Sequence, residues 1–165
     1  MQEFEFRHRF SLPPPDLVSL IDDTGFRSHL IGRLDTIRQS ERLAYEDSPS
    51  ERRKLIRVYP ELHLPSWIER AIRHREPYFE MNYLLDKQSM IETVWGEARI
   101  GKFRGQTFYL PDGGGGTMRK LTGSFQCDIH LVGRAVEKIY MNRMTNMYDR
   151  EAELTQEYID QRSAA

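Results

Sequence analysis

The sequence lacks several features that define common classes of protein. Its single cysteine, Cys127, excludes an intramolecular disulfide and a zinc site built from cysteines. Lysine plus arginine (24) nearly equals aspartate plus glutamate (25), so no overall attraction to nucleic acid or to an anionic membrane is expected. No apolar run reaches about 18 residues, and the N-terminal stretch does not resemble a signal peptide. We therefore expect a cytoplasmic protein, folded as one domain over residues 1–165.

Glycine and proline are absent from a long C-terminal segment, residues 134–162. Apolar side chains recur there with the 3.6-residue period of one helical face: Val136, Ile139, Tyr140, Met144, Met147, Leu154 and Tyr158. A helix of about 29 residues is roughly 44 Å long, comparable to a strand of about 13 residues. This predicted helix must therefore lie against an extended apolar surface.

Seven segments show the alternation of strands. In the first, Phe4, Phe6, His8 and Phe10 alternate with charged residues before Pro13–Pro15. The others are expected at about residues 36–45, 52–59, 79–85, 91–95, 103–110 and 117–131. The last has one apolar face: Leu121, Gly123, Phe125, Cys127, Ile129 and Leu131.

Three short helices are predicted between these strands. Asp16 is expected to cap the first, which runs through Ile21, and Phe26–Ile31 forms the second. The third follows Pro65 and contains Trp67.

This order of elements resembles the helix-grip fold of the START-like superfamily of polyketide cyclases and lipid-transport proteins. The passage Ile129–Glu137 is similar to the "P-L-V-G-x-x-I-E" entry to the last helix in an uncharacterised branch, with His130 in place of proline. Leu64–Ile68 looks like the "L-P-x-W/L" helix of that branch. The resemblance implies an α+β fold in which a curved seven-stranded antiparallel sheet wraps around the C-terminal helix. It also implies a site for an apolar ligand between sheet and helix.

The candidate ligand-binding residues come from the helix and from the strands expected to face it. They are Tyr140, Met144, Met147, Phe79, Met81, Tyr83, Trp95 and Phe125. Methionine suits a pocket that adapts to its guest, although it also fills gaps in solid cores. The pattern thus favours a cavity and leaves a filled core as the alternative.

Two polar residues join this set. Arg143 lies near the centre of the apolar stripe, where a charge needs a partner. It either anchors a carboxylate or phosphate of the ligand, or it pairs with a strand carboxylate such as Glu80 or Glu92, or it extends to the cavity mouth. His8 has the buried parity of its strand, so it is either a ligand contact or base, or a core histidine with protein partners.

The helix containing Trp67 also carries Arg70, Arg73 and Arg75. This combination could dock transiently on an anionic membrane, or the helix is an ordinary surface element. His29, His63 and His74 are too far apart in sequence to suggest a zinc site, and no cofactor is predicted.

These observations favour a non-catalytic carrier or sensor for one hydrophobic or amphipathic, lipid-like small molecule, because no nucleophile–base pair is recognisable. One alternative is an enzyme of the cyclase or hydrolase type, in which Arg143 stabilises an oxyanion and His8 or a tyrosine moves a proton. The other is a protein-interaction module with a filled core. No nucleic acid partner is expected.

Overall fold

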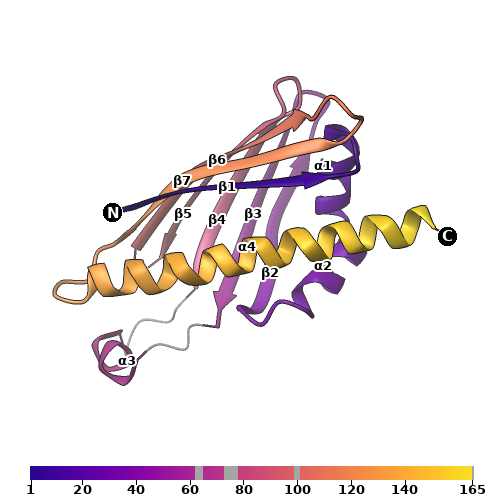
Figure 1. Ribbon diagram of the computed structural model, residues 1–165. Coiled ribbons are helices and arrows are strands. Elements are labelled where there is room, and N and C mark those ends of the chain that lie inside the picture. Colours follow the sequence, from indigo (N-terminus) through magenta and orange to yellow (C-terminus); the bar gives the residue numbers. More distant parts are fainter. Residues whose placement is uncertain (62–64, 73–77, 99–100, 165) are drawn as a thin grey trace.

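The computed structural model describes residues 1–61, 65–72, 78–98 and 101–164 (Figure 1). The strands are β1 (Gln2–Phe10), β2 (Ile37–Asp47), β3 (Glu51–Pro60), β4 (Phe79–Asp86), β5 (Ile91–Ala98), β6 (Gly101–Pro111) and β7 (Thr117–Cys127). The helices are α1 (Pro14–Asp22), α2 (Thr24–Ile31), α3 (Ser66–Ile72) and α4 (Gly133–Ser163).

The strands form one antiparallel sheet in the order β1-β7-β6-β5-β4-β3-β2. Strands β1 and β2 therefore lie at opposite edges, and α1 and α2 connect them. Helix α4 lies across one face of the sheet, with α1 and α2 near its C-terminal half (Figure 1). The α+β helix-grip architecture predicted from the sequence is confirmed.

Strands β6 and β7 approach each other closely where Gly105 pairs with Gly123. A Cβ atom on Gly123 would lie 2.3 Å from the carbonyl oxygen of Arg104 and 2.7 Å from the Phe4 ring. Only glycine fits such a close approach. This pair of glycines lets the sheet pack Phe4 directly over β7.

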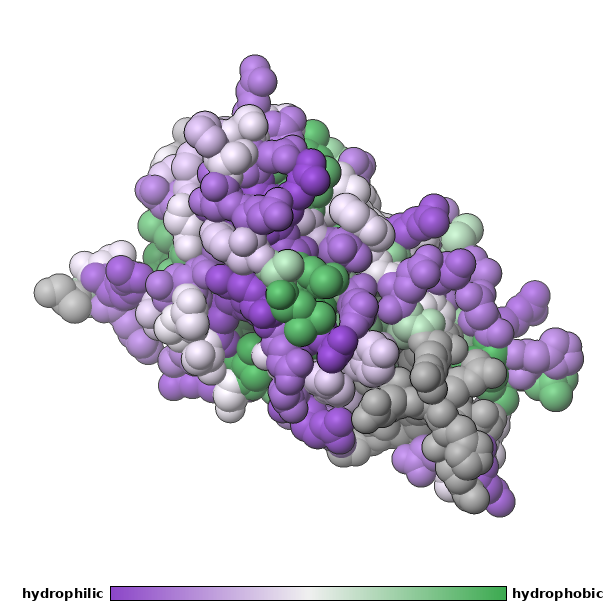
Figure 2. All heavy atoms as spheres, turned by 180° about the vertical axis from the view of Figure 1, so that it is seen from behind, coloured by the Kyte–Doolittle hydropathy of each residue, from purple (hydrophilic) through white to green (hydrophobic). Residues whose placement is uncertain are grey.

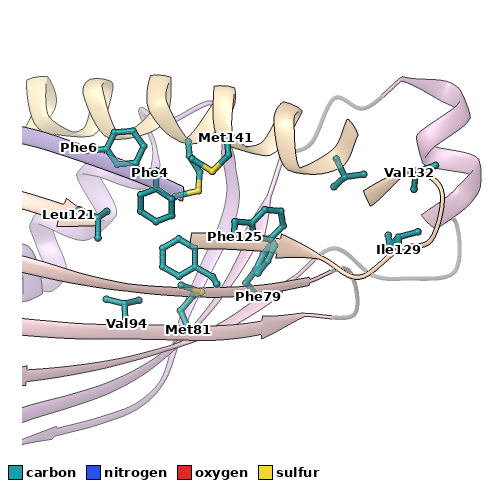
Figure 3. Packing of buried hydrophobic residues seen from close by; sticks show 13 residues of the cluster. Phe4, Phe6, Phe79, Met81, Val94, Leu121, Phe125, Ile129, Val132 and Met141 are labelled. Atoms are coloured by element: carbon teal, nitrogen blue, oxygen red, sulfur yellow. The ribbon is translucent and has the colours of Figure 1, made fainter. Parts of the chain in front are cut away.

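The main hydrophobic core lies between the sheet and the N-terminal half of α4 (Figure 3). Phe79, Met81 and Phe125 point from the sheet toward the helix, and Met141 points from α4 toward them. A second cluster joins α1, α2 and the C-terminal half of α4 through Leu17, Phe26 and Ile159. Helix α4 thus packs along its length against two different sets of apolar side chains.

Two local predictions were wrong. The last strand ends at Cys127, and Leu131 is 92% exposed with a φ of 69°, because the chain turns there into α4. Asp16 lies inside the first turn of α1, and the capping side chain is Asp23, whose Oδ1 accepts a hydrogen bond from the Phe26 N–H (2.8 Å) at the start of α2.

The exposed apolar groups on the face opposite to that of Figure 1 are scattered. Seen from behind, the surface is mostly hydrophilic, and hydrophobic atoms form small separate areas (Figure 2). Trp67 on α3 is 50% exposed, whereas Leu64, Arg73, His74 and Arg75 lie outside the described residues. None of the helices in the described part of the chain has the length and apolar character needed to span a bilayer.

Candidate ligand-binding site

Two adjoining cavities lie between α4 and the inner face of the sheet, and strands β2 to β7 contribute residues to their walls. Helix α4 packs most closely against β1 and β7, which leaves space on its other side. The apolar compartment, defined by Phe79, Met81, Tyr140 and Met144, has a volume of about 120 Å³. The charged compartment, defined by Lys54, Glu92, Arg119 and Glu151, has a volume of about 210 Å³. Their shared wall consists of Ile37, Val58, Tyr83, Phe103, Met147 and Tyr148.

The apolar compartment contains most of the residues predicted from the sequence. The alternation of side chains along β4 places Phe79, Met81 and Tyr83 on the inner face of the sheet. The residues that α4 contributes are three or four positions apart, so they lie on the helical face opposite this strand. The seven predicted residues that line it are Phe79, Met81, Tyr83, Tyr140, Arg143, Met144 and Met147. Thr36 also lines it, and its Oγ1 atom is buried without a partner among the described residues.

Two other predicted residues lie near the site without lining either compartment. Phe125 is 0% exposed and packs behind the apolar wall, with its ring centroid 4.1 Å from that of Tyr140. His8 lies on β1 with Nε2 2.9 Å from Asp149 Oδ1 and Nδ1 3.4 Å from an Arg119 nitrogen. His8 is thus engaged by protein groups from α4 and β7.

The prediction that Trp95 lines the ligand-binding site was wrong. This side chain lies on the outer face of the sheet and is 40% exposed, whereas Glu92, Val94 and Gly96 face inward from β5. The prediction placed Trp95 inside, but the inner positions of β5 hold a glutamate, a valine and a glycine. A Cβ atom on Gly96 would lie 2.3 Å from the sulfur of Met81, so the inner face has no room for a side chain there.

Arg143 lies at the end of the apolar compartment nearest Glu61. Its guanidinium donates a hydrogen bond to the Glu61 carbonyl oxygen at 3.4 Å. The two carboxylates suggested as partners have other cations, since Glu80 binds Arg57 (2.6 Å) and Glu92 binds Lys54 (3.1 Å). Arg143 therefore contributes a guanidinium to the lining of the apolar compartment, and neither Glu80 nor Glu92 is its partner.

The charged compartment is built around Lys54, which is 7% exposed. Its ammonium lies 2.8 Å from Asp22 and 3.1 Å from Glu92, and Asp22 also binds Arg52. Burial opposes the charged ammonium, but Glu92 and Asp22 outweigh it and raise the pKa of Lys54 above its ordinary value. Lys54 is therefore a cation held between two carboxylates at neutral pH.

A second buried pair closes the opposite side of this compartment. Arg119 on β7 donates two hydrogen bonds to the carboxylate of Glu151 on α4, one of them 2.9 Å long. Arg27 on α2 also lines the cavity, where it donates a hydrogen bond to Ser40 Oγ (3.4 Å) and forms no ion pair with any described residue. Burial lowers the pKa of Arg27, and the positive charge of the nearby Arg42 lowers it further.

Sequence reasoning missed the charged compartment, although a signal was present. Lys54, Glu92 and Arg119 each alternate with inward apolar residues on their strands, in the order Lys54-Ile56-Val58, Glu92-Val94 and Arg119-Leu121. A charged residue with inward parity on three strands predicts buried ion pairs. Which carboxylate pairs with which cation depends on strand order and on α1 and α4.

Comparisons with solved structures place this architecture among START-like proteins. The Zhui aromatase/cyclase from Streptomyces sp. R1128 superposes with a TM-score of 0.72 at 10% identity, covering 98% of this chain and 95% of that chain. TTHA0849 from Thermus thermophilus gives 0.66 at 16% identity, covering 94% and 95%. A START superfamily protein from Mycobacterium smegmatis gives 0.61 at 11% identity, covering 96% and 97%. At these identities the likeness establishes the fold.

The sequence itself assigns the family. Residues 5–159 match the model described as "Protein of unknown function (DUF2505)", so the chain belongs to this family. No curated protein matches the sequence significantly. The predicted relationship to an uncharacterised START-like family is thus confirmed.

Proposed function

We propose that this member of the DUF2505 family is a non-catalytic carrier or sensor that binds one apolar or amphipathic small molecule between the sheet and α4. The observation that carries the proposal is the pair of adjoining cavities between the inner face of the sheet, α2 and α4; both have mostly apolar walls, and one of them also contains buried ion pairs. A ligand with an apolar body and a polar part fits this division. The fold shared with the Mycobacterium smegmatis START superfamily protein and with the Zhui aromatase/cyclase supports a ligand-binding domain.

The cavity volumes favour a compact ligand. Together the two compartments reach only the lower end of the range of about 300–1,000 Å³ typical of ligand pockets. Met144 and Met147 can change rotamer and enlarge the apolar part. A small ring system or a short chain is therefore a better candidate than a long-chain lipid.

A cyclase-type or hydrolase-type enzyme is the second candidate, because Lys54, Glu92 and Arg119 converge in one cavity. Three features make it the weaker one. His8 does not line either compartment, and burial raises the pKa of Tyr83 and Tyr148, so neither phenol is a good base at neutral pH. The charges of Lys54 and Glu92 also neutralise each other.

Native mass spectrometry of the purified protein, followed by extraction, tests the proposal. We expect a bound small molecule that disappears on denaturation. Val58→Phe adds a ring at the shared wall and should abolish the adduct, whereas Leu55→Phe adds the same ring on the outer face of β3 and should keep it. No adduct and no uptake of apolar fluorescent probes by the wild type would refute binding. Turnover of the extracted compound would favour the enzyme.

A further inference from the structure

Three tyrosines meet at the two compartments, and their rings are held in place by packing. Tyr83 on β4 lies with its ring centroid 4.9 Å from the Lys54 ammonium. On α4, the Tyr140 ring packs against Phe125, and the Tyr148 ring lies 5.0 Å from that of Phe6. Tyr83 and Tyr148 line both compartments, and Tyr140 lines the apolar one. Tyr83 and Tyr148 therefore belong to the shared wall, and Tyr140 lies on the apolar side of it.

The hydroxyl groups of these tyrosines make no hydrogen bond to any other residue that the structure describes. Buried tyrosine hydroxyls usually have a partner, as Tyr109 has in Glu92 (3.3 Å). The three hydroxyls are also not sealed in protein. Among described side chains, only Thr36 Oγ1 and Arg42 Nε are both inaccessible and without a partner. The hydroxyls of Tyr83, Tyr140 and Tyr148 therefore reach open space, and the open space that these residues line is the cavity.

The hydroxyls are hydrogen-bond donors at physiological pH. Burial raises the pKa of all three, and each is also close enough to another of the three to have its pKa raised further. Protonated phenols in an apolar setting bind most strongly to a ligand oxygen that accepts a hydrogen bond. Hydrocarbon surface alone would leave these donors unpaired.

We infer that the ligand carries a carbonyl or hydroxyl oxygen in the middle of an apolar body, and that this oxygen accepts hydrogen bonds from the hydroxyls of Tyr83 and Tyr148 at the shared wall, with Tyr140 offering a further donor from the apolar compartment. The inference rests on the proposed function and narrows its ligand class. It selects an oxygenated ring compound over a hydrocarbon or a lipid whose single polar group is terminal. The shared wall lies between the two compartments, so a ligand oxygen bound at this wall has one part of the ligand on each side of it.

A matched pair of probes tests this inference. Benzophenone and 1,1-diphenylethylene have nearly the same shape, with a carbonyl oxygen in the first and a methylene group in the second placed between two phenyl rings. We expect the wild type to prefer benzophenone in calorimetric titrations. Loss of one typical hydrogen bond weakens binding about three- to tenfold, so the triple variant Tyr83→Phe, Tyr140→Phe, Tyr148→Phe should lose at least this much affinity for benzophenone. Its affinity for 1,1-diphenylethylene should be unchanged.

Controls separate this inference from the proposed function. Tyr45→Phe removes a hydroxyl from the outer face, where the side chain is 41% exposed, and should leave both affinities as in the wild type. The triple variant breaks no hydrogen bond between described residues, so its circular dichroism and Tm should match or exceed those of the wild type. An unchanged preference in the triple variant, or a co-purified compound without oxygen, would overturn the inference and leave ligand binding intact. No bound compound and no binding of either probe would overturn both.

Discussion

The two ends of the interior are equally buried but are held together by different forces. Around the apolar compartment, Phe79 is 2% and Phe125 0% exposed, and the contacts are between rings and methionines. Around the charged compartment, Lys54 is 7% and Arg119 7% exposed, and the contacts are paired charges. Burial alone therefore does not distinguish a hydrophobic core from an ionic one.

The difference lies in how each end responds to change. Apolar packing is non-directional, so the loss of a few atoms costs free energy in proportion to what is removed. A buried ion pair depends on both partners, and removal of one leaves an uncompensated charge in a low dielectric. Four predictions test this contrast, ordered by their expected effect on stability.

Raising the pH should unfold the protein by acting on the interior tyrosines. Burial raises the pKa of Tyr83, Tyr109, Tyr140 and Tyr148 above the ordinary value. A group with a raised folded pKa contributes stability that is fully present below the unfolded pKa and is lost as pH rises. The free energy of unfolding should therefore fall above about pH 10.

Phenolate absorbance and circular dichroism, recorded together against pH, measure this effect. We expect the absorbance change to be completed only in the step in which the circular dichroism is lost. In guanidinium chloride, where the protein is unfolded, all eight tyrosines should ionise at a lower pH than the one at which the folded protein loses its circular dichroism. Complete ionisation of a protein that is still folded would contradict the prediction.

Lys54→Met should destabilise the charged end by about 3–5 kcal/mol, because Glu92 and Asp22 lose their shared cation. Urea denaturation measures the change. Arg53→Met is the matched control, since this neighbouring side chain is 59% exposed on the outer face and pairs with Glu51. The control should change stability by less than about 1 kcal/mol. Similar losses for both variants would show that the interior charges are screened like surface ones.

Met144→Ala should destabilise the apolar end by about 2–3 kcal/mol, in the lower part of the range for buried methionine. Met144 is 4% exposed but borders a cavity, so its side chain has neighbours on fewer sides. Met118→Ala on the opposite face of β7 is the control and should cost less. If Met144→Ala costs as much as Lys54→Met, the two ends do not differ in the way described above.

Arg143→Met should have the smallest effect on stability and should act on binding. If Arg143 anchors an anionic group, the variant loses affinity for a short-chain fatty acid by about tenfold or more, while an uncharged lipid of the same short chain length binds as before. Arg150→Met, on the exposed part of α4 with Glu153 as partner, is the control. Equal losses for the charged and the uncharged lipid would exclude an anchoring role.

Periodicity predicted the fold because each strand and α4 bury one face. The alternation of Phe4, Phe6 and Phe10, and the helical spacing of Val136, Met144 and Leu154, require a sheet and a long helix that face each other. Periodicity failed where a strand breaks the rule that apolar residues face inward. On β5, Trp95 is outside and Glu92 is inside, because Met81 occupies the space at Gly96 and Lys54 needs a carboxylate.

Local periodicity is enough to predict the order of elements, the direction of most side chains and the methionine-rich face of α4. Folding of the whole chain is needed to bring Asp22, Lys54 and Glu92 into one network and to place Tyr83, Tyr140 and Tyr148 around one cavity. These groups lie far apart in the chain. Their meeting depends on strand register and on the position of α4, and neither is encoded in any single segment.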